Sequence, residues 1–140
     1  MSDLVQFLRD RLDEDFEAVQ VVLGVNVMAA MRDGVPAPRW IPSPKNDVGI
    51  WDTNRQPRVK YAWPRERDHI IRHDPARVLA EVEAGRKAIE HYERVVAHAR
   101  QDDAYVLAVG AVEVQLKIRA LPYADHPDYR AEWRAGEDTT

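Results

Sequence analysis

The chain contains no cysteine among its 140 residues. This absence excludes disulfide bonds, thiolate zinc sites and catalytic thiols, so any bound metal must be held by histidine and carboxylate side chains. It also fits a reducing compartment, and we expect a cytoplasmic protein. No apolar run reaches the 18 or more residues of a membrane span, and the first residues lack the pattern of a secretory signal, so we expect no membrane association.

Glycine is scarce and scattered, which narrows the enzymatic functions open to the chain. The six glycines stand isolated, so there is no glycine-rich loop of the kind that holds nucleotide phosphates. The sequence also lacks the Ser-His-Asp order of a hydrolase triad. These absences favour a protein without enzymatic activity, and we expect no cofactor unless a divalent metal is bound.

Charge is distributed unevenly along the chain. The net charge is −4, yet residues 34–77 hold nine Lys or Arg against five Asp or Glu, and the segments on both sides are acidic. An acidic protein with one basic face is therefore expected. The chain as a whole lacks the basic balance of a general nucleic-acid-binding protein, so nucleic acid is not the partner we expect first.

Regularly spaced apolar residues predict the first long helix. Leu4, Leu8 and Leu12 recur every four residues, and the pattern continues far enough to predict a helix over about 3–31. Residues 21–31 are apolar on all sides, which fits either a buried helix end or a strand. Length alone does not decide between the two.

Two prolines mark further helix starts. Pro64 and Pro75 each suit the first position of a helix, where the missing backbone donor would be unpaired anyway. Asp74, directly before Pro75, is a suitable N-cap. The tail after Pro122 is expected to be anchored by Tyr129 and Trp133.

The segment between the first and second long helices differs in composition. Residues 34–64 hold six of the nine prolines and three of the four tryptophans, which excludes an interior helix. Val59, Tyr61 and Trp63 alternate with Arg58, Lys60 and Ala62, a pattern typical of a strand with one buried face. The pattern predicts a small antiparallel ribbon whose aromatic side chains pack on the helices.

These patterns together predict an α+β fold that is mainly α, with a small antiparallel β-ribbon inserted between the first and second of three long helices. We expect a single domain over residues 1–140 with the following elements: a helix over about 3–31, a β-ribbon over about 37–63, a short helix over 64–73, helices over about 75–101 and 103–121, and a tail over 122–140.

Two histidines form the clearest candidate for chemistry. His69 and His73 stand four residues apart, a spacing that places both imidazoles on one helical face, and Asp74 with His126 from the tail would complete a divalent-metal site or the centre of a metal-dependent hydrolase. The structural alternative is that Asp74 only caps a helix. We favour the cap, because no general base stands between the histidines as in a His-Glu-x-x-His motif.

A second candidate is a site for nucleic acid or another anion. Basic residues interleave with Trp51, Tyr61 and Trp63, the combination that single-stranded nucleic acid requires. The predicted alternation argues against it, because it places Tyr61 and Trp63 on the face opposite Lys60. The basic residues of this candidate site are Arg55, Arg58, Lys60, Arg65, Arg67 and Arg72.

The third candidate is a protein interface. Residues 104–112 are apolar on every side, so the helix that contains them is either central in the core or one half of an oligomer interface. We expect a homodimer, and the predicted interface residues are Tyr105, Val106, Val109 and Val112.

Three stretches, DLVQFLRDRLDED (3–15), HIIRHDPARVLAEV (69–82) and LPYADHPDYRAEW (121–133), resemble a family of short uncharacterised proteins of Streptomyces, other actinobacteria and their phages. Members of that family usually leave the first helix through a Thr-Pro-Gly-Pro-Trp-like step, whereas here residues 18–31 extend the apolar pattern. The resemblance implies the kind of genome from which the protein comes, and it supplies no catalytic residue. We therefore expect a small accessory or protein-interaction protein of an actinobacterial or phage genome.

Overall fold

A computed structural model describes residues 2–134, and their contacts divide them into two compact units. Unit 1 contains residues 2–14 and 82–134, and unit 2 contains residues 15–81. The single domain expected from chain length therefore contains two compact units. The predicted fold class, α+β and mainly α with an antiparallel ribbon after the first helix, is confirmed.

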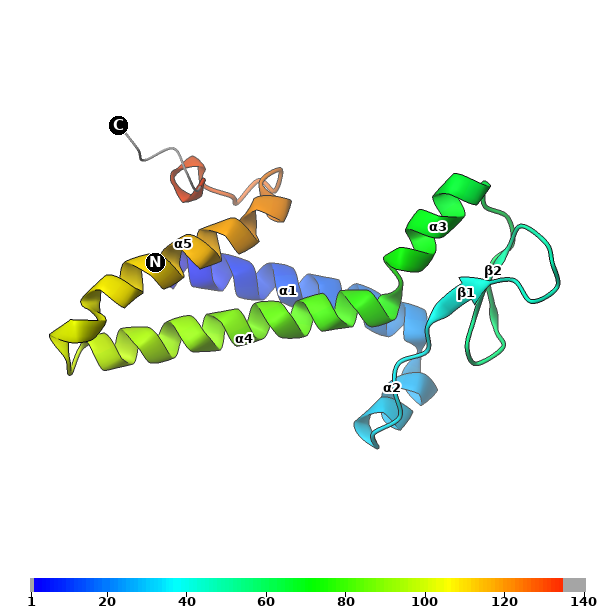
Figure 1. Cartoon of the computed structure of the whole chain (residues 1–140), viewed down its shortest axis with the longest axis horizontal. Coiled ribbons are helices and arrows are strands. Elements are labelled where there is room, and N and C mark those ends of the chain that lie inside the picture. Colours follow the sequence, from blue (N-terminus) through cyan, green and yellow to red (C-terminus); the bar gives the residue numbers. More distant parts are fainter. Residues whose placement is uncertain (1, 135–140) are drawn as a thin grey trace. The chain divides into compact units, whose positions relative to one another are not determined.

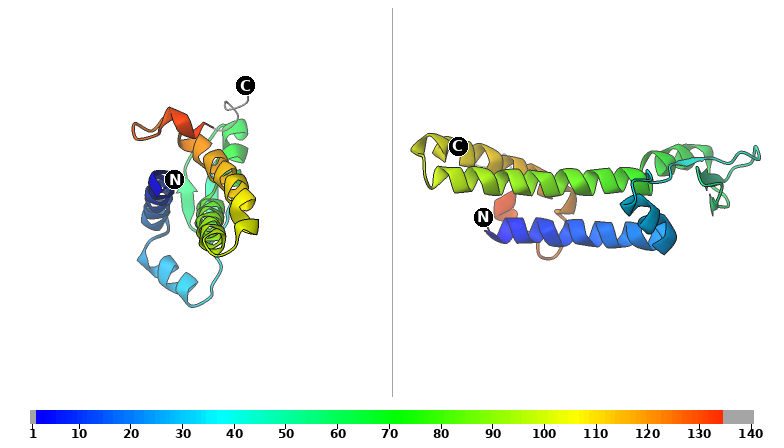
Figure 2. Two further views of the ribbon diagram at one scale, coloured as in Figure 1. Left: turned by 90° about the vertical axis from the view of Figure 1, so that its left-hand side faces the viewer. Right: turned by 90° about the horizontal axis from the view of Figure 1, so that it is seen from below.

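Unit 1 is helical, and its three main helical segments lie side by side (Figures 1 and 2). Its elements are the first part of α1 (Ser2–Leu23), most of α4 (Pro75–Ala99), α5 (Val106–Ala120) and the 3-10 turns η1 (Asp103–Tyr105), η2 (Leu121–Tyr123) and η3 (Ala131–Trp133). The helix predicted over 75–101 corresponds to α4, and the helix predicted over 103–121 corresponds to η1 followed by α5.

The helices of unit 1 pack closely because apolar side chains meet a small residue. Leu4, Leu8 and Leu12 are buried, as their four-residue spacing predicts. A Cβ atom built on Gly85 of α4 would lie only 2.8 Å from Cδ2 of Leu12. Glycine at this position therefore lets α4 approach α1 more closely than any other residue would.

The tail of unit 1 is held by aromatic contacts. Trp133 is buried, and its ring centroid lies 5.1 Å from that of Phe7 and 5.6 Å from that of Tyr129. The predicted anchoring of the tail by Tyr129 and Trp133 is confirmed. Residues 135–140 of the predicted tail lie outside the described residues.

Unit 2 contains a three-stranded antiparallel sheet between helices. Its elements are the end of α1, α2 (Val25–Arg32), β1 (Trp40–Pro42), β2 (Ile50–Asp52), β3 (Pro57–Val59), α3 (Pro64–Arg72) and the start of α4. The strand order is β1-β2-β3, with Trp40 opposite Asp52 in the first pair. In the second pair Ile50 lies opposite Val59 and Trp51 opposite Pro57, so the register shifts at this point.

Two buried aspartates organise the backbone of unit 2. Asp52 Oδ1 accepts hydrogen bonds from the backbone N–H groups of Asn54 and Gln56, and its Oδ2 accepts one from Arg58 Nε at 2.8 Å. Its side chain is fully buried. The carboxylate therefore closes the turn between β2 and β3, since buried polar groups must find partners.

Asp74 has the same role at the start of α4. Its Oδ1 accepts from the backbone N–H of Arg77, which confirms the predicted N-cap. Its Oδ2 accepts from the backbone N–H of Trp40 at 3.0 Å and from Arg39 Nε at 2.9 Å. One carboxylate thus joins the first turn of α4 to the first strand.

The first helix differs from its prediction at Gly24. One helix over about 3–31 is expected from the pattern, but α1 ends at Leu23 and α2 begins at Val25. Gly24 has a φ of 84°, which glycine tolerates and an α-helix cannot contain. Residues 25–31 are helical, so the strand alternative for this segment is wrong.

The last strand also differs from its prediction. β3 ends at Val59, and the backbone N–H of Ala62 then donates to the carbonyl oxygen of Val48, which turns Ala62 inward. Ala62 is buried, whereas Tyr61 and Trp63 are 54% and 64% exposed. The predicted burial of these two aromatic side chains is therefore wrong, because the strand alternation on which it rests stops before them.

Candidate functional site

Helix α5 carries apolar side chains on two opposite faces. On the inner face Leu116 and Ala120 are buried, and Val109 and Val112 are half-buried. The outer face, which we call the α5 stripe, is exposed, and Leu107 is 89% accessible. The α5 stripe consists of Leu107, Ala111, Val114 and Ile118 of α5 and of Leu121, which directly follows the helix in η2.

The geometry of a helix explains why these residues form one stripe. They are separated by four, three, four and three positions, so at about 100° per residue all five point within roughly 40° of one direction. Leu116 points to the opposite side. A helix on the surface of a single folded chain normally has only one apolar face, and a second, exposed one is typical of a protein interface.

None of the four predicted interface residues belongs to the α5 stripe. Tyr105 and Val106 are exposed at the start of α5, whereas Val109 and Val112 belong to the inner face. The five residues of the α5 stripe were not predicted. Their spacing in the sequence is the signal that points to them, since it is the repeat of a helix that pairs with another helix.

The histidine corner joins α3 to α4 in unit 2. The rings of His69 and His73 lie 4.4 Å apart between centroids, and His73 Nδ1 lies 2.9 Å from the carbonyl oxygen of His69. Both side chains are exposed. Asp74 is directed elsewhere, because both of its oxygens are occupied by the cap and the strand contacts described above.

His126, the fourth predicted metal ligand, has its contacts in unit 1. Its Nε2 contacts Nη1 of Arg11, and its Nδ1 accepts from the backbone N–H of Asp128. Arg11 is itself buried against the ring of Phe7. Within residues 2–134, no group of three or more His, Asp or Glu side chains is arranged to hold a metal ion.

Four of the six predicted anion-binding residues are free of the buried network of unit 2. Arg58 is bound to Asp52, and Arg67 Nη1 donates to the carbonyl oxygen of Asp47 at 3.2 Å. The remaining four are exposed: Arg55, Lys60, Arg65 and Arg72.

Exposed aromatic rings accompany these cations. The rings of Tyr61 and Trp63 meet edge to face with centroids 5.4 Å apart. Lys60 and Arg65 flank the pair in sequence and are exposed with it. Because Tyr61 and Trp63 are accessible, the sequence-based argument against a nucleic-acid site at this position no longer holds.

Asp47 lies in the loop before β2, and its carbonyl oxygen accepts a hydrogen bond from Arg67. The backbone N–H of Gly49 donates to Asp47 Oδ1 at 2.9 Å, and this hydrogen bond, followed by one with Ser43, lowers the pKa of Asp47. Asp47 is therefore a structural acceptor that fixes the loop. It is not poised to act as a general base near neutral pH.

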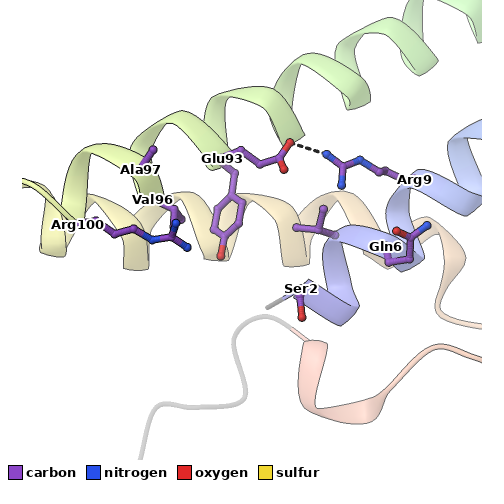
Figure 3. A pocket seen from close by; sticks show the side chains of 9 residues that line it. Ser2, Gln6, Arg9, Glu93, Val96, Ala97 and Arg100 are labelled. Carbon is purple, nitrogen blue, oxygen red and sulfur yellow. Dashed lines mark hydrogen bonds and ion pairs between the residues drawn. The ribbon is translucent and has the colours of Figure 1, made fainter.

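A groove of about 430 Å³ lies between the start of α1 and the end of α4 in unit 1 (Figure 3). Arg9 and Glu93 form an ion pair at one side, and Arg100 lies at the other. Burial, followed by the charges of Glu113 and Glu93, raises the pKa of Tyr92 in its wall. The groove offers a binding volume without a paired nucleophile and base.

Another apolar surface lies where α1 meets α2 in unit 2. Val21 is 85% exposed, and with Val25 and Met28 it lines a hollow of about 540 Å³. These residues lie on both sides of the break at Gly24 and so do not form one continuous helical stripe. The surface is an accessible apolar patch with no ordered spacing.

Comparison with known proteins identifies one family. Residues 1–135 match the family described as "Family of unknown function (DUF6221)". No curated protein and no solved structure matches the chain. In the part of the chain that the structure describes, no helix has the length and apolar character needed to cross a membrane.

Proposed function

The chain belongs to the DUF6221 family, whose function is unknown, and we propose that it is a small non-enzymatic interaction protein that forms a homodimer through the α5 stripe. We also propose that it acts in the cytoplasm and comes from an actinobacterial or phage genome. The similarity of the three stretches in α1, α3–α4 and the tail supports the origin, and the lack of cysteine fits the compartment.

The observation that carries the dimer is the exposure of the α5 stripe. Apolar surface gains roughly 25 cal/mol for each Å² removed from water, so leaving an ordered row of such side chains in solvent is unfavourable. A second copy offers the same row at the same concentration. A two-fold interface uses one surface patch twice, and the α5 stripe is such a patch.

A non-enzymatic role fits the chemistry of the candidate sites. The histidine corner has two imidazoles whose neighbouring carboxylate is engaged elsewhere, and the groove of unit 1 has an ion pair and a tyrosine whose pKa is raised. A hydrolase requires a nucleophile or activated water with a base in reach. Neither site offers that set.

Light scattering combined with size-exclusion chromatography tests the dimer. We expect the wild-type chain to have about twice the 16.1 kDa mass of one copy, and the double variant Leu107→Glu/Ile118→Glu to be monomeric, because charged side chains would face each other across the contact. Val21→Glu/Val25→Glu is the matched control, since it places the same two charges on exposed apolar residues of unit 2. It should remain dimeric.

Two results would contradict the proposal. One is a wild-type chain that stays monomeric over the whole accessible concentration range. The other is a double variant that remains dimeric with an unchanged circular dichroism spectrum, because the dimer would then use another surface. A variant that loses its helical spectrum is replaced by Leu107→Ser/Ile118→Ser, which removes the apolar contact without adding charge.

A second candidate function is binding of single-stranded nucleic acid through the exposed pair Tyr61 and Trp63. The pair supplies stacking surfaces, and Lys60 and Arg65 supply charge for the phosphates. Stacking of a base on an aromatic ring is worth about 1–3 kcal/mol, so Trp63→Ala should weaken binding about 5- to 150-fold.

Fluorescence anisotropy of a labelled single-stranded oligonucleotide tests this second candidate. Affinity should fall steeply as salt is raised, because binding of cations to phosphates releases counterions. Tyr105→Ala is the control, since Tyr105 is an exposed aromatic residue of unit 1. Absence of binding at low salt would exclude the site.

A further inference from the structure

We infer that the two copies of α5 pair antiparallel, across a two-fold axis that passes between the levels of Ala111 and Val114. The inference rests on the proposed function and names the partner surface: α5 of one copy binds α5 of the other. It concerns direction and register, which the existence of a dimer alone does not fix.

The spacing of the central apolar residues is the same in both directions. Leu107, Ala111, Val114 and Ile118 are separated by four, three and four positions. A two-fold rotation that reverses the helix therefore places each of them level with another member of the set. Leu107 then faces Ile118 of the second copy, and Ala111 faces Val114.

Side-chain volumes favour this arrangement over a parallel one. In a parallel pair, identical residues meet, so two alanines at position 111 would leave a gap between layers of larger residues. In the antiparallel pair every layer combines two different residues, with the small ones at the centre and the large ones at the ends. Two crossing helices approach most closely at the centre, where small residues are needed, and unfilled space is destabilising.

The residues that flank the stripe are compatible with the same register. Gly110 and Lys117 lie on one side of it, and the antiparallel register brings Lys117 beside Gly110 of the second copy. A Cβ built on Gly110 would meet nothing within 4 Å, so this side of α5 is open to a long side chain. The two Lys117 ammonium groups lie toward opposite ends of the contact, which avoids repulsion between like charges.

The outer end of the stripe also finds an apolar neighbour in this register. Leu121 in η2 comes near the level of Ala104 in η1 of the second copy, and Ala104 is exposed. The helix dipoles oppose each other in the antiparallel pair, which adds a small favourable interaction.

Introduced cysteines test the direction directly, because the natural chain has none to interfere. Leu107→Cys and Ile118→Cys are prepared separately and oxidised either alone or as an equimolar mixture. In the antiparallel pair, neither variant links to itself, because its two copies lie at opposite ends of the contact. When subunits exchange at random, half of the dimers in the mixture contain one chain of each variant. About half of all chains should therefore become disulfide-linked.

Val114→Cys serves as the control for the shared surface. Position 114 lies next to the axis, so this variant should link to itself whenever the α5 stripe forms the contact. If Leu107→Cys linked to itself when oxidised alone, and Val114→Cys linked as well, the helices would pair in parallel. This result would overturn the inference and leave the proposed dimer intact.

The remaining outcomes are also decisive. A monomeric wild-type chain with no cross-linking at any position overturns both proposals. A dimer in which Val114→Cys never links uses a different surface, and this overturns both the proposed interface and its register. A thermal unfolding curve of each reduced variant close to that of the wild type shows that the substitutions preserve the fold.

Discussion

Unit 1 and unit 2 are stabilised by different kinds of interaction. Unit 1 is held by leucines on two helices and by the contact of Phe7 with Trp133. Unit 2 has fewer buried apolar side chains, and the fully buried carboxylates of Asp52 and Asp74 determine the path of its backbone. In unit 2, a few buried polar groups with satisfied hydrogen bonds specify a fold with a small apolar core. Unit 1 has more apolar side chains than its core contains, and those left exposed can bind a partner.

The largest expected effect is the loss of a carboxylate anchor in unit 2. Asp52→Ala removes the acceptor of two backbone N–H groups and leaves Arg58 without its partner, so we expect a loss of about 3–5 kcal/mol in the free energy of unfolding. Urea titration followed by circular dichroism measures it. Asp13→Ala, which removes an exposed ion pair with Arg86, is the control and should cost at most about 1 kcal/mol. If Asp52→Ala also lowered the free energy of unfolding by no more than this, buried carboxylates would not be what stabilises unit 2.

The packing of unit 1 is tested by filling its closest helix contact. Gly85→Val forces a branched side chain against Leu12, so we expect a loss of about 1–3 kcal/mol. Gly110→Ala is the matched control, because its Cβ meets nothing, and better helix propensity should stabilise α5 by about 0.5–1 kcal/mol. If Gly85→Val and Gly110→Ala changed the melting temperature alike, the close approach of α4 to α1 would be contradicted.

A smaller effect is expected from acid. The pKa of Asp47 is lowered by the backbone N–H of Gly49 and the Ser43 hydroxyl, so its contribution to stability is present above its ordinary value of 3.8 and is lost as pH falls through the folded-state pKa. The difference in unfolding free energy between the wild type and Asp47→Asn should be constant above that pH and shrink below it. Because the largest cause of the lowered pKa is a hydrogen bond, added salt should not remove the difference in unfolding free energy. A difference that grows in acid would contradict this assignment.

The smallest effect is expected at the histidine corner. Two imidazoles without a third ligand hold zinc weakly, so added zinc should raise the melting temperature only slightly, and His73→Ala should abolish that rise. Elemental analysis after mild purification provides the independent measurement. A full equivalent of zinc, manganese or nickel would restore the metal-dependent alternative and would make unit 2 a metal-stabilised unit.

Much of the helical fold could be predicted because its signals are local. Apolar residues every three or four positions indicate α1, and the prolines at 64 and 75 mark the starts of α3 and α4, without knowledge of what these helices pack against. The break at Gly24 was missed because isolated glycine occurs inside helices as well, and only the backbone angle distinguishes the two cases. The exposure of Tyr61 and Trp63 depends on where β3 ends, and that is set by a hydrogen bond to the distant Val48.

The helix that carries the candidate site could be predicted, but the residues of the α5 stripe could not, for a similar reason. The sequence shows that residues 104–112 are apolar on every side, but which side of α5 is covered depends on the tertiary packing of Leu116 and Ala120. Burial of Asp52 and Asp74 is equally invisible, because charged residues are normally exposed. Asp74 could be identified as a cap from the following proline, whereas its bond to Trp40 joins segments far apart in the chain.

That bond has a consequence for the exchange of backbone hydrogens with solvent. The N–H groups of Trp40 and Arg77 are both bound to the carboxylate of Asp74, one in a strand and one in the first turn of a helix. Each can exchange with deuterium only after its bond to that carboxylate opens. A rotation of the Asp74 side chain releases both at once, so two amides in different elements report on a single local opening.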